Sequence, residues 1–250
     1  MRCLPLLACA GLLAAGACTP RAVTPPARMF AMDSPTAPDA GRTDVQLDGT
    51  VMGQVFGPEG LGANARVRHT LEPGVSLEVD GGVFHVTNSP EAGDTFDRNG
   101  YTGRVGVLLH TPSRHWALGG GLGGGVSNTA GNWGAADIHG MVSGAHELIR
   151  PMLSVAFGYS APFGDQTFTV HYSGEDNESG VATLQLPRNA FLQTSVGLEL
   201  GPRDRAVLLG ASLLRFWLFE DSVLSGPDAG EQQRDDAYFA LGIGLRLGLN

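Results

Sequence analysis

The sequence predicts an all-β chain that closes as a single antiparallel, up-and-down transmembrane β-barrel of about ten strands. Three observations predict this fold class. Apolar residues alternate with small or polar residues in repeated runs, which is the period of a β-strand. The connections between these runs are short and long in turn. Aromatic residues gather beside the long connections.

The last run, Tyr238–Asn250, shows the alternation most clearly. Large apolar residues occupy every second position, and Ala, Gly and one arginine, Arg246, lie between them. A half-buried strand of a soluble protein has polar residues on its second face, whereas here that face is nearly bare backbone. This composition is typical of a strand whose large side chains face lipid and whose glycines line a crowded lumen.

Nine further runs alternate in the same way and complete the predicted barrel. They cover residues 45–56, 61–71, 75–83, 101–110, 115–126, 133–145, 153–159, 192–200 and 205–218. Run 115–126 has a second face made of small residues only, namely Ala117, Gly119, Gly121, Gly123 and Gly125. Run 205–218 is apolar on both faces, which predicts a β-bulge. A barrel of eight strands is the alternative if run 45–56 or run 133–145 is not a strand.

The connections and the aromatic residues place the two ends of the runs on opposite sides of a membrane. Short connections at 72–74, 111–114, 146–150 and 201–204 alternate with longer ones at 88–100, 161–189 and 219–236. Outer-membrane barrels have short periplasmic turns and long external loops. Aromatic residues beside the long connections predict an interfacial girdle. They are Phe56, Phe84, Tyr101, Trp133, Phe157, Tyr159, Phe191, Phe216, Trp217, Tyr238 and Phe239, with Trp116 as the exception.

The N-terminal residues predict export. Residues 1–17 read as a signal peptide, because Arg2 precedes an apolar run that is too short to span a bilayer. The end of this run resembles both a signal peptidase I site and a lipoprotein lipobox, and in the second case Cys18 is lipidated. Residues 18–44 are rich in proline and predict an extended tether that runs from a lipid anchor in the inner, periplasmic leaflet to the barrel at 45–250. The mature chain then has no internal cysteine, which excludes disulfides and thiolate metal sites.

The inward positions of the predicted strands carry acids and arginines in near balance. These lumen candidates are Asp48, Glu78, Asp80, Asp137 and Glu199 with Arg66, Arg68, Arg104 and Arg246. Unpaired charges in a narrow barrel are costly, so we expect ion pairs that seal the lumen. A narrow path for ions or solutes is the alternative. Asp48 is the expected partner of Arg246, because closure places the last strand beside the first.

The long connections are strongly acidic and predict an external surface that repels nucleic acid. Such a surface suits cations or a cationic partner. The acidic stretch 174–180 has oxygen ligands for Ca²⁺ but lacks the spacing of a calcium loop, so it predicts a solvated loop. No metal site and no cofactor are predicted, and the sequence does not indicate an oligomeric state.

One short motif favours an enzymatic function. His85-Val86-Thr87-Asn88 is similar to the H-x-S-N run of outer-membrane lipid A deacylases, in which the histidine activates the serine, but Thr87 stands in place of that serine. We therefore predict no enzyme and keep a lipid A-modifying hydrolase as an alternative.

The composition excludes a disordered acidic chain, because charged residues are only 16% of the chain and Gly contributes 37 of 250 residues.

From Val45 to Asn250, the strand pattern resembles the small bacterial outer-membrane β-barrel (porin-like) superfamily. The resemblance implies a location in the bacterial outer membrane and contact with its lipid. The sequence predicts a structural or binding scaffold with a charge-paired, largely closed lumen and acidic external loops. The alternatives are a narrow porin or channel, and a soluble β-barrel lipoprotein.

Overall fold

The computed structural model describes residues 24–29, 32–53, 59–87, 98–127, 131–164, 166–171, 179–185, 187–219, 223–225 and 237–249. Regular structure in these residues is entirely β-strand. In the described ranges, no helix is long and apolar enough to cross a membrane. The predicted signal peptide and Cys18 lie outside the described residues.

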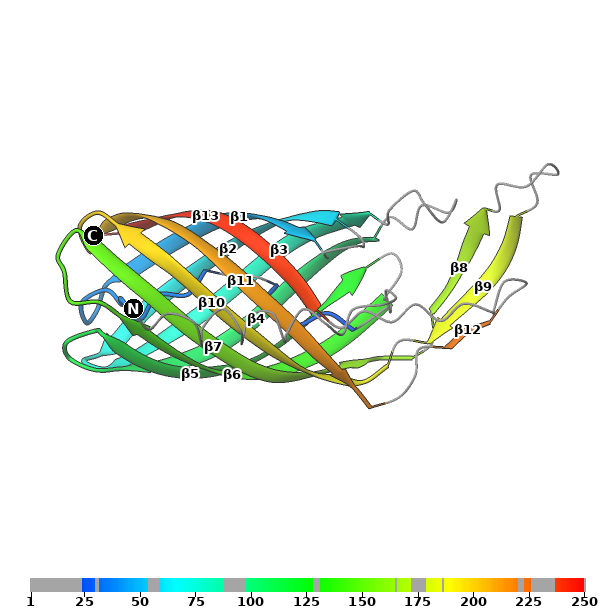
Figure 1. The fold of residues 1–250 in the computed structure, drawn as a ribbon. Helices are drawn as coiled ribbons and strands as arrows, with labels where there is room; N and C mark the ends of the chain where they lie inside the picture. The colour runs from blue at the N-terminus through cyan, green and yellow to red at the C-terminus, as the bar shows by residue number, and fades with distance from the viewer. Residues whose placement is uncertain are drawn as a thin grey trace, which may run out of the picture.

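Ten strands form one closed antiparallel barrel (Figure 1). They are β1 (Thr43–Gly53), β2 (Glu59–Glu72), β3 (Val75–Thr87), β4 (Arg98–His110), β5 (Trp116–Ser127), β6 (Gly131–Ser143), β7 (Ile149–Pro162), β10 (Asn189–Leu200), β11 (Arg205–Leu218) and β13 (Ala237–Leu249). Each strand pairs with the strands next to it in the barrel, and β1 closes the barrel against β13. The prediction of a ten-stranded antiparallel barrel is confirmed.

Three short strands lie outside the barrel wall. They are β8 (Gln166–His171), β9 (Ser179–Gln185) and β12 (Val223–Ser225), and they pair as a separate three-stranded sheet. Figure 1 shows this sheet beyond the end of the barrel that carries the long connections, here named the loop end. The opposite end is named the turn end. The sequence interpretation of both long connections as loops throughout was wrong.

The predicted bulge in run 205–218 is also wrong. Strand β11 pairs with β10 and with β13 without a register shift, and the one irregularity among the described pairings lies between Thr70 and Glu72. Strand β11 is apolar on both faces for a different reason. Its inward residues Leu208, Leu214 and Phe216 are fully buried in the lumen, so they pack there as core residues.

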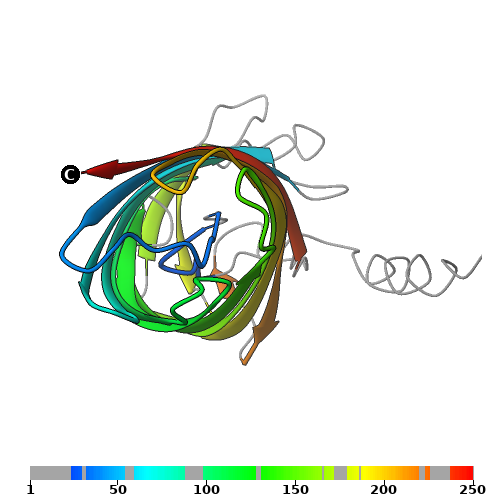
Figure 2. The same ribbon diagram turned by 90° about the vertical axis from the view of Figure 1, so that its left-hand side faces the viewer.

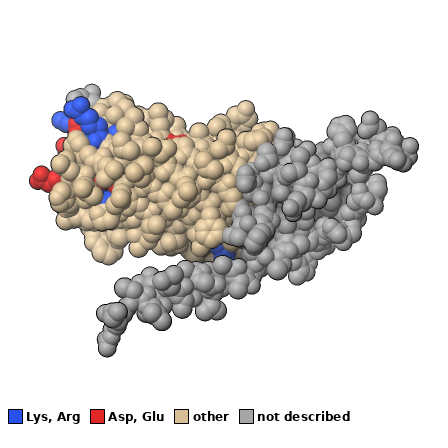
Figure 3. Space-filling view, turned by 45° about the horizontal axis from the view of Figure 1, so that its top comes forward, with Lys and Arg blue, Asp and Glu red and all other residues tan. Residues whose placement is uncertain are grey.

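The outer wall is apolar and the inside is polar, the reverse of a soluble barrel. Large outward residues such as Leu122, Leu241 and Trp116 are 66%, 69% and 63% exposed. Inward charged residues such as Glu78 and Arg68 are 1% and 2% exposed. Figure 3 shows charged atoms at the turn end and almost none on the described wall between the two ends. Exposed apolar surface of this extent indicates contact with lipid or another apolar partner.

Half of the predicted aromatic girdle lies inside the barrel. Five of its rings are at most 9% exposed and pack with Met52, Leu214 and Ala240 in one apolar cluster, here named the aromatic layer: Phe84, Trp133, Phe191, Phe216 and Tyr238. The girdle prediction was wrong for these residues. The outward members of the predicted girdle are Tyr101, Phe157, Tyr159, Trp217 and Phe239, and Trp116 lies outward at the turn end. Phe56 lies outside the described residues.

Glycines on neighbouring strands leave the space that these rings occupy. A Cβ atom on Gly100, Gly125 or Gly158 would lie 2.3–2.4 Å from the ring of Phe84, Trp133 or Phe191, respectively. Other members of the glycine face of β5 make room in the same way: a Cβ on Gly119 would meet His139, one on Gly121 would meet Arg104, and one on Gly123 would meet Ala27. The glycine face therefore receives large side chains from adjacent elements.

Gly125→Ala is expected to destabilise the barrel by roughly 1–3 kcal/mol through overpacking. The new Cβ would lie 2.3 Å from the Tyr101 carbonyl oxygen and 2.4 Å from the Trp133 ring. Gly103→Ala is the matched control, because this glycine lies on the adjacent strand and has nothing within 4 Å of its Cβ position. Urea unfolding in detergent measures both variants, and equal losses would contradict the packing role.

Candidate functional site

The lumen is the candidate site, and the chain before β1 fills part of it. Residues 24–42, here named the plug segment, are described except for positions 30 and 31. Figure 2, a view along the barrel, shows this blue segment inside the ring of strands. Met32, Asp33 and Ser34 are at most 4% exposed. The interpretation of this segment as an extended tether is therefore corrected for the described residues.

Strands β1 and β2 hold the plug segment largely through its backbone carbonyl groups. Gln46 donates to the Met32 carbonyl at 2.6 Å, and Asn64 donates to the Met29 carbonyl at 3.2 Å. Arg68 donates to the carbonyls of Ser34 and Thr36 at 3.2 and 2.7 Å. Buried backbone carbonyl groups need hydrogen-bond donors. The plug segment does not supply these donors itself, so the inward polar side chains of β1 and β2 do.

Contacts at the turn end of the barrel fix the C-terminal end of the plug segment. Arg114, in the connection between β4 and β5, donates a hydrogen bond to the carboxylate of Asp39. This hydrogen bond lowers the pKa of the Asp39 carboxyl from its usual value. The backbone N–H of Gly41 donates to the Thr70 carbonyl at 2.7 Å, which joins the segment to β2.

One group of ion pairs lies near mid-depth and is named the central cluster. Arg104 makes a bidentate contact with Asp137, with N–O distances of 2.6 and 2.8 Å, and also contacts Asp80 at 3.0 Å. Arg66 lies 2.7 Å from Asp80 and 2.9 Å from Asp33 of the plug segment. All five side chains are at most 9% exposed. A bidentate, fully desolvated geometry of this kind fixes both partners.

A second group lies closer to the turn end and is named the turn-side cluster. Glu199 accepts hydrogen bonds from Arg150 and from Arg246, each at 2.5 Å. Its other carboxylate oxygen accepts from the hydroxyls of Ser34 and Thr36, at 2.5 and 3.2 Å. Glu199 is 0% exposed, so its charge is balanced entirely by protein groups.

The predicted partner of Arg246 is therefore corrected. Arg246 points into the lumen and is 1% exposed, but its carboxylate partner is Glu199 on β10 and not Asp48 on β1. Asp48 accepts instead from Gln46 at 2.8 Å and from Asn64 at 3.2 Å. The register explains this result, because Gln46 is the residue directly opposite Arg246, and Asp48 lies opposite Gly244.

Three buried polar atoms in or beside the central cluster have no hydrogen-bond partner among the described residues. They are Nη1 of Arg66, Oε2 of Glu78 and Nε2 of His139. His139 Nδ1 lies 3.0 Å from Asp137, and its Nε2 lies 3.8 Å from Glu78 Oε2. Glu78 is paired through its other oxygen with Arg68, at 2.7 Å. The separation of 3.8 Å between Nε2 of His139 and Oε2 of Glu78 is longer than a hydrogen bond.

All nine predicted lumen residues lie on the inward side of the barrel, but the network contains more members than the sequence indicated. Arg28 and Asp33 come from the plug segment, and Arg28 contacts both Asp33 and Asp80. Arg150 lies at the start of β7, where the sequence placed a turn. The acidic residues of the long connections lie mostly outside the described ranges, as does most of the stretch 174–180.

The hydrolase alternative rests on His85, near the loop end of β3. Its Nδ1 lies 2.6 Å from the side-chain oxygen of Asn99 on β4. Thr87 is the last residue of β3, and Asn88 lies outside the described residues. The contact with Asn99 orients the imidazole ring, and the catalytic interpretation of His85 stays a prediction.

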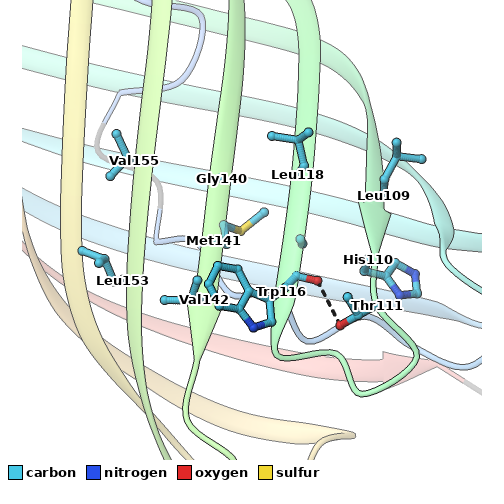
Figure 4. Close-up of a pocket in the computed structure, with 11 residues that line it drawn as sticks. Leu109, His110, Thr111, Trp116, Leu118, Gly140, Met141, Val142, Leu153 and Val155 are labelled. Carbon is cyan, nitrogen blue, oxygen red and sulfur yellow. Dashed lines mark hydrogen bonds between the residues drawn. The ribbon is translucent and has the colours of Figure 1, made fainter.

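Two shallow grooves on the outer wall are apolar. One has a volume of about 610 Å³ and lies over Gly140, where the absence of a side chain lowers the surface (Figure 4). Trp116, Leu118, Val142, Leu153 and Val155 surround it. Because its lining is mainly apolar, with His110 and Thr111 as its polar members, this groove has the character of a lipid-facing depression and not of a catalytic pocket.

The fold and the lumen together define a closed antiparallel β-barrel with an apolar outer wall and a filled, ion-paired interior. No protein-family model and no curated protein sequence matches the chain. Similar solved structures include bacterial outer-membrane barrels. The translocator domain of autotransporter NalP from Neisseria meningitidis is 12% identical, with a TM-score of 0.47 over 82% of this chain and 87% of that chain.

Two further solved structures show the same level of similarity. The outer membrane protease OmpT from Escherichia coli is 10% identical, with a TM-score of 0.44 over 83% of this chain and 97% of that chain. The outer membrane protein OprG from Pseudomonas aeruginosa is 11% identical, with a TM-score of 0.37 over 86% and 99%. Similarity this low carries no argument about what this chain binds or does.

Proposed function

We propose that the chain is a bacterial outer-membrane barrel that acts as a structural or binding scaffold with a closed lumen. The observation that carries this proposal is the filling of the lumen by the plug segment and by the two ion-pair clusters. Arg68, Arg104, Glu78, Glu199 and Arg246 are each at most 2% exposed, which supports a lumen without a continuous water-filled path. Porins, in contrast, have a polar interior that contains water.

The outer wall supports the membrane part of this proposal. Its strands carry leucine, valine and aromatic residues outward, while most described charged residues lie inside or at the turn end, and Arg215 lies outward near the loop end beside Trp217. Outer-membrane lipid is therefore the proposed partner of the wall. Cations or a cationic partner are the proposed ligands of the acidic external loops, because the sequence places most of the acidic residues in those connections.

Planar-bilayer recording of the full-length mature protein tests the closed lumen. We expect little or no stable conductance, because ion pairs and plug contacts occupy the path that ions would take. Heat-modifiable migration on a detergent gel first establishes that the barrel is folded. Large, steady channels from folded protein would contradict the scaffold and favour a porin.

A gated channel is the second candidate, and one observation favours it. The described contacts between the plug segment and the strands are ion pairs, hydrogen bonds and apolar packing without a covalent cross-link, so movement of the segment would open the lumen. Rare openings that appear at high voltage or in acid, with a closed state otherwise, would favour this candidate.

We propose no catalytic role for this chain. Loss of lipid A acyl chains on expression, abolished by His85→Ala, would contradict that.

A further inference from the structure

The plug segment has its two described ends at opposite ends of the barrel. At the turn end, Asp39 contacts Arg114 and Gly41 joins β2. At the far end, Asn189 Nδ2 donates to the Thr24 carbonyl at 3.0 Å, and the Thr24 hydroxyl donates to the Pro187 carbonyl at 2.7 Å. Asn189 is the first residue of β10 and borders a long connection, so Thr24 lies at the loop end.

The contacts between these two ends are spread along the barrel axis. Thr36 and Ser34 contact Glu199, which is near the turn end of β10. Asp33 then reaches the central cluster, and Met29 packs against the aromatic layer. Thr24 contacts Asn189 at the opposite end of the same strand, β10. The chain therefore crosses the whole lumen before β1 begins.

We propose that this passage carries the N-terminal end of the mature chain to the external face of the membrane. The proposal rests on the membrane orientation proposed above, with the turns in the periplasm and the long connections outside. It reverses the expectation that the residues before β1 run from a periplasmic anchor to the barrel. Thr24, the first described residue of the segment, lies at the loop end.

Chain length then decides which leaflet an anchor on Cys18 can enter. Cys18 is six positions before Thr24, and a fully extended chain covers at most about 3.6 Å per residue, or about 20 Å in total. The hydrocarbon core of a bilayer is about 30 Å thick. Acyl chains on Cys18 would therefore insert in the outer leaflet, because the periplasmic leaflet is out of reach from Thr24.

Epitope tags on intact cells test the proposal with the full-length chain. One variant carries the tag between positions 23 and 24. A second carries it in the turn between Pro112 and Ser113, and a third after Gly164 at the loop end of β7. We expect antibody to label the first and third variants equally on intact cells and the second only after permeabilisation. Labelling of the first variant only after permeabilisation, with the other two as expected, would overturn the inference.

The reference tags separate this failure from a failure of the proposed orientation. If the turn tag is labelled on intact cells and the loop tag is not, the membrane orientation is wrong and the inference is wrong with it. If all three tags need permeabilisation, the barrel does not reach the cell surface, and both proposals are overturned.

A disulfide test examines the path of the chain without an inserted tag. Thr24→Cys with Asn189→Cys, in a Cys18→Ser background that leaves no other cysteine in the mature chain, should form a bond on mild oxidation. Thr24→Cys with Pro202→Cys is the matched control, because Pro202 follows the turn end of β10, and no bond is expected there. A bond in the control pair, or none at Asn189, would overturn the proposed passage.

Discussion

Glu199→Leu is expected to lower the free energy of unfolding by roughly 3–5 kcal/mol. The substitution leaves the guanidinium groups of Arg150 and Arg246 buried without the carboxylate that each contacts at 2.5 Å. The hydroxyls of Ser34 and Thr36 lose their shared acceptor at the same time. The loss falls on two strands and on the plug segment together, which is why it should exceed that of any single outward substitution.

Urea unfolding in detergent, followed by heat-modifiable migration, measures this loss. Asp204→Leu is the control, because its ion pair with Arg205 is 64% and 74% exposed and should contribute at most about 1 kcal/mol. In a Glu199→Leu, Arg246→Leu double variant, one unpaired charge is removed, so the two losses should not add. Equal losses for Glu199→Leu and Asp204→Leu would contradict the role of the turn-side cluster.

Strand number and orientation could be predicted from the sequence because lipid and lumen impose opposite chemistries on alternate residues. The wall therefore carries a period of two in every strand, and the connections carry the asymmetry of the two membrane sides. The inward direction of Arg246 followed from the same alternation. Its partner did not, because pairing across a lumen depends on depth and side-chain reach as well as on strand order.

The inward position of two rings of the aromatic layer agrees with the alternation of residues along their strands. Phe84 alternates with the outward residue Val83, and Tyr238 alternates with the outward residue Phe239, so the period of two already placed both rings inside. Their position at strand ends favoured a girdle instead. Alternation is the stronger indication of side-chain direction, because it is fixed by backbone geometry. Aromatic residues near an interface pack well on either side of the barrel wall.

The plug segment could not be recognised from side-chain patterns. Its contacts with β1 and β2 run largely through backbone carbonyls, including those of Met29, Met32 and Thr36. Every residue has a carbonyl group, so no alternation or motif marks such a segment. Two of its charged residues, Arg28 and Asp33, add one charge of each sign to the lumen and therefore leave the near balance of acids and arginines unchanged.

Deletion of residues 24–37 is expected to convert the closed barrel into a conducting one. The deletion removes the plug-segment groups that Arg68, Gln46 and Glu199 contact inside the lumen. It also uncovers part of the glycine face of β5, where Ala27 now lies at the position that a Cβ on Gly123 would need. Water should then hydrate the freed polar groups and provide a continuous path.

Single-channel recording compares this variant with the full-length mature chain and with Asp39→Asn. The last is the matched control, because it weakens only the exposed contact of the plug segment with Arg114 and leaves the buried contacts in place. Steady openings are expected in the deletion variant alone. A folded deletion variant that stays silent would show that the ion-pair clusters close the lumen without the plug segment. Openings in Asp39→Asn would instead show that the contact at the turn end holds the segment in place, because the buried hydrogen bonds would then be too weak to retain it.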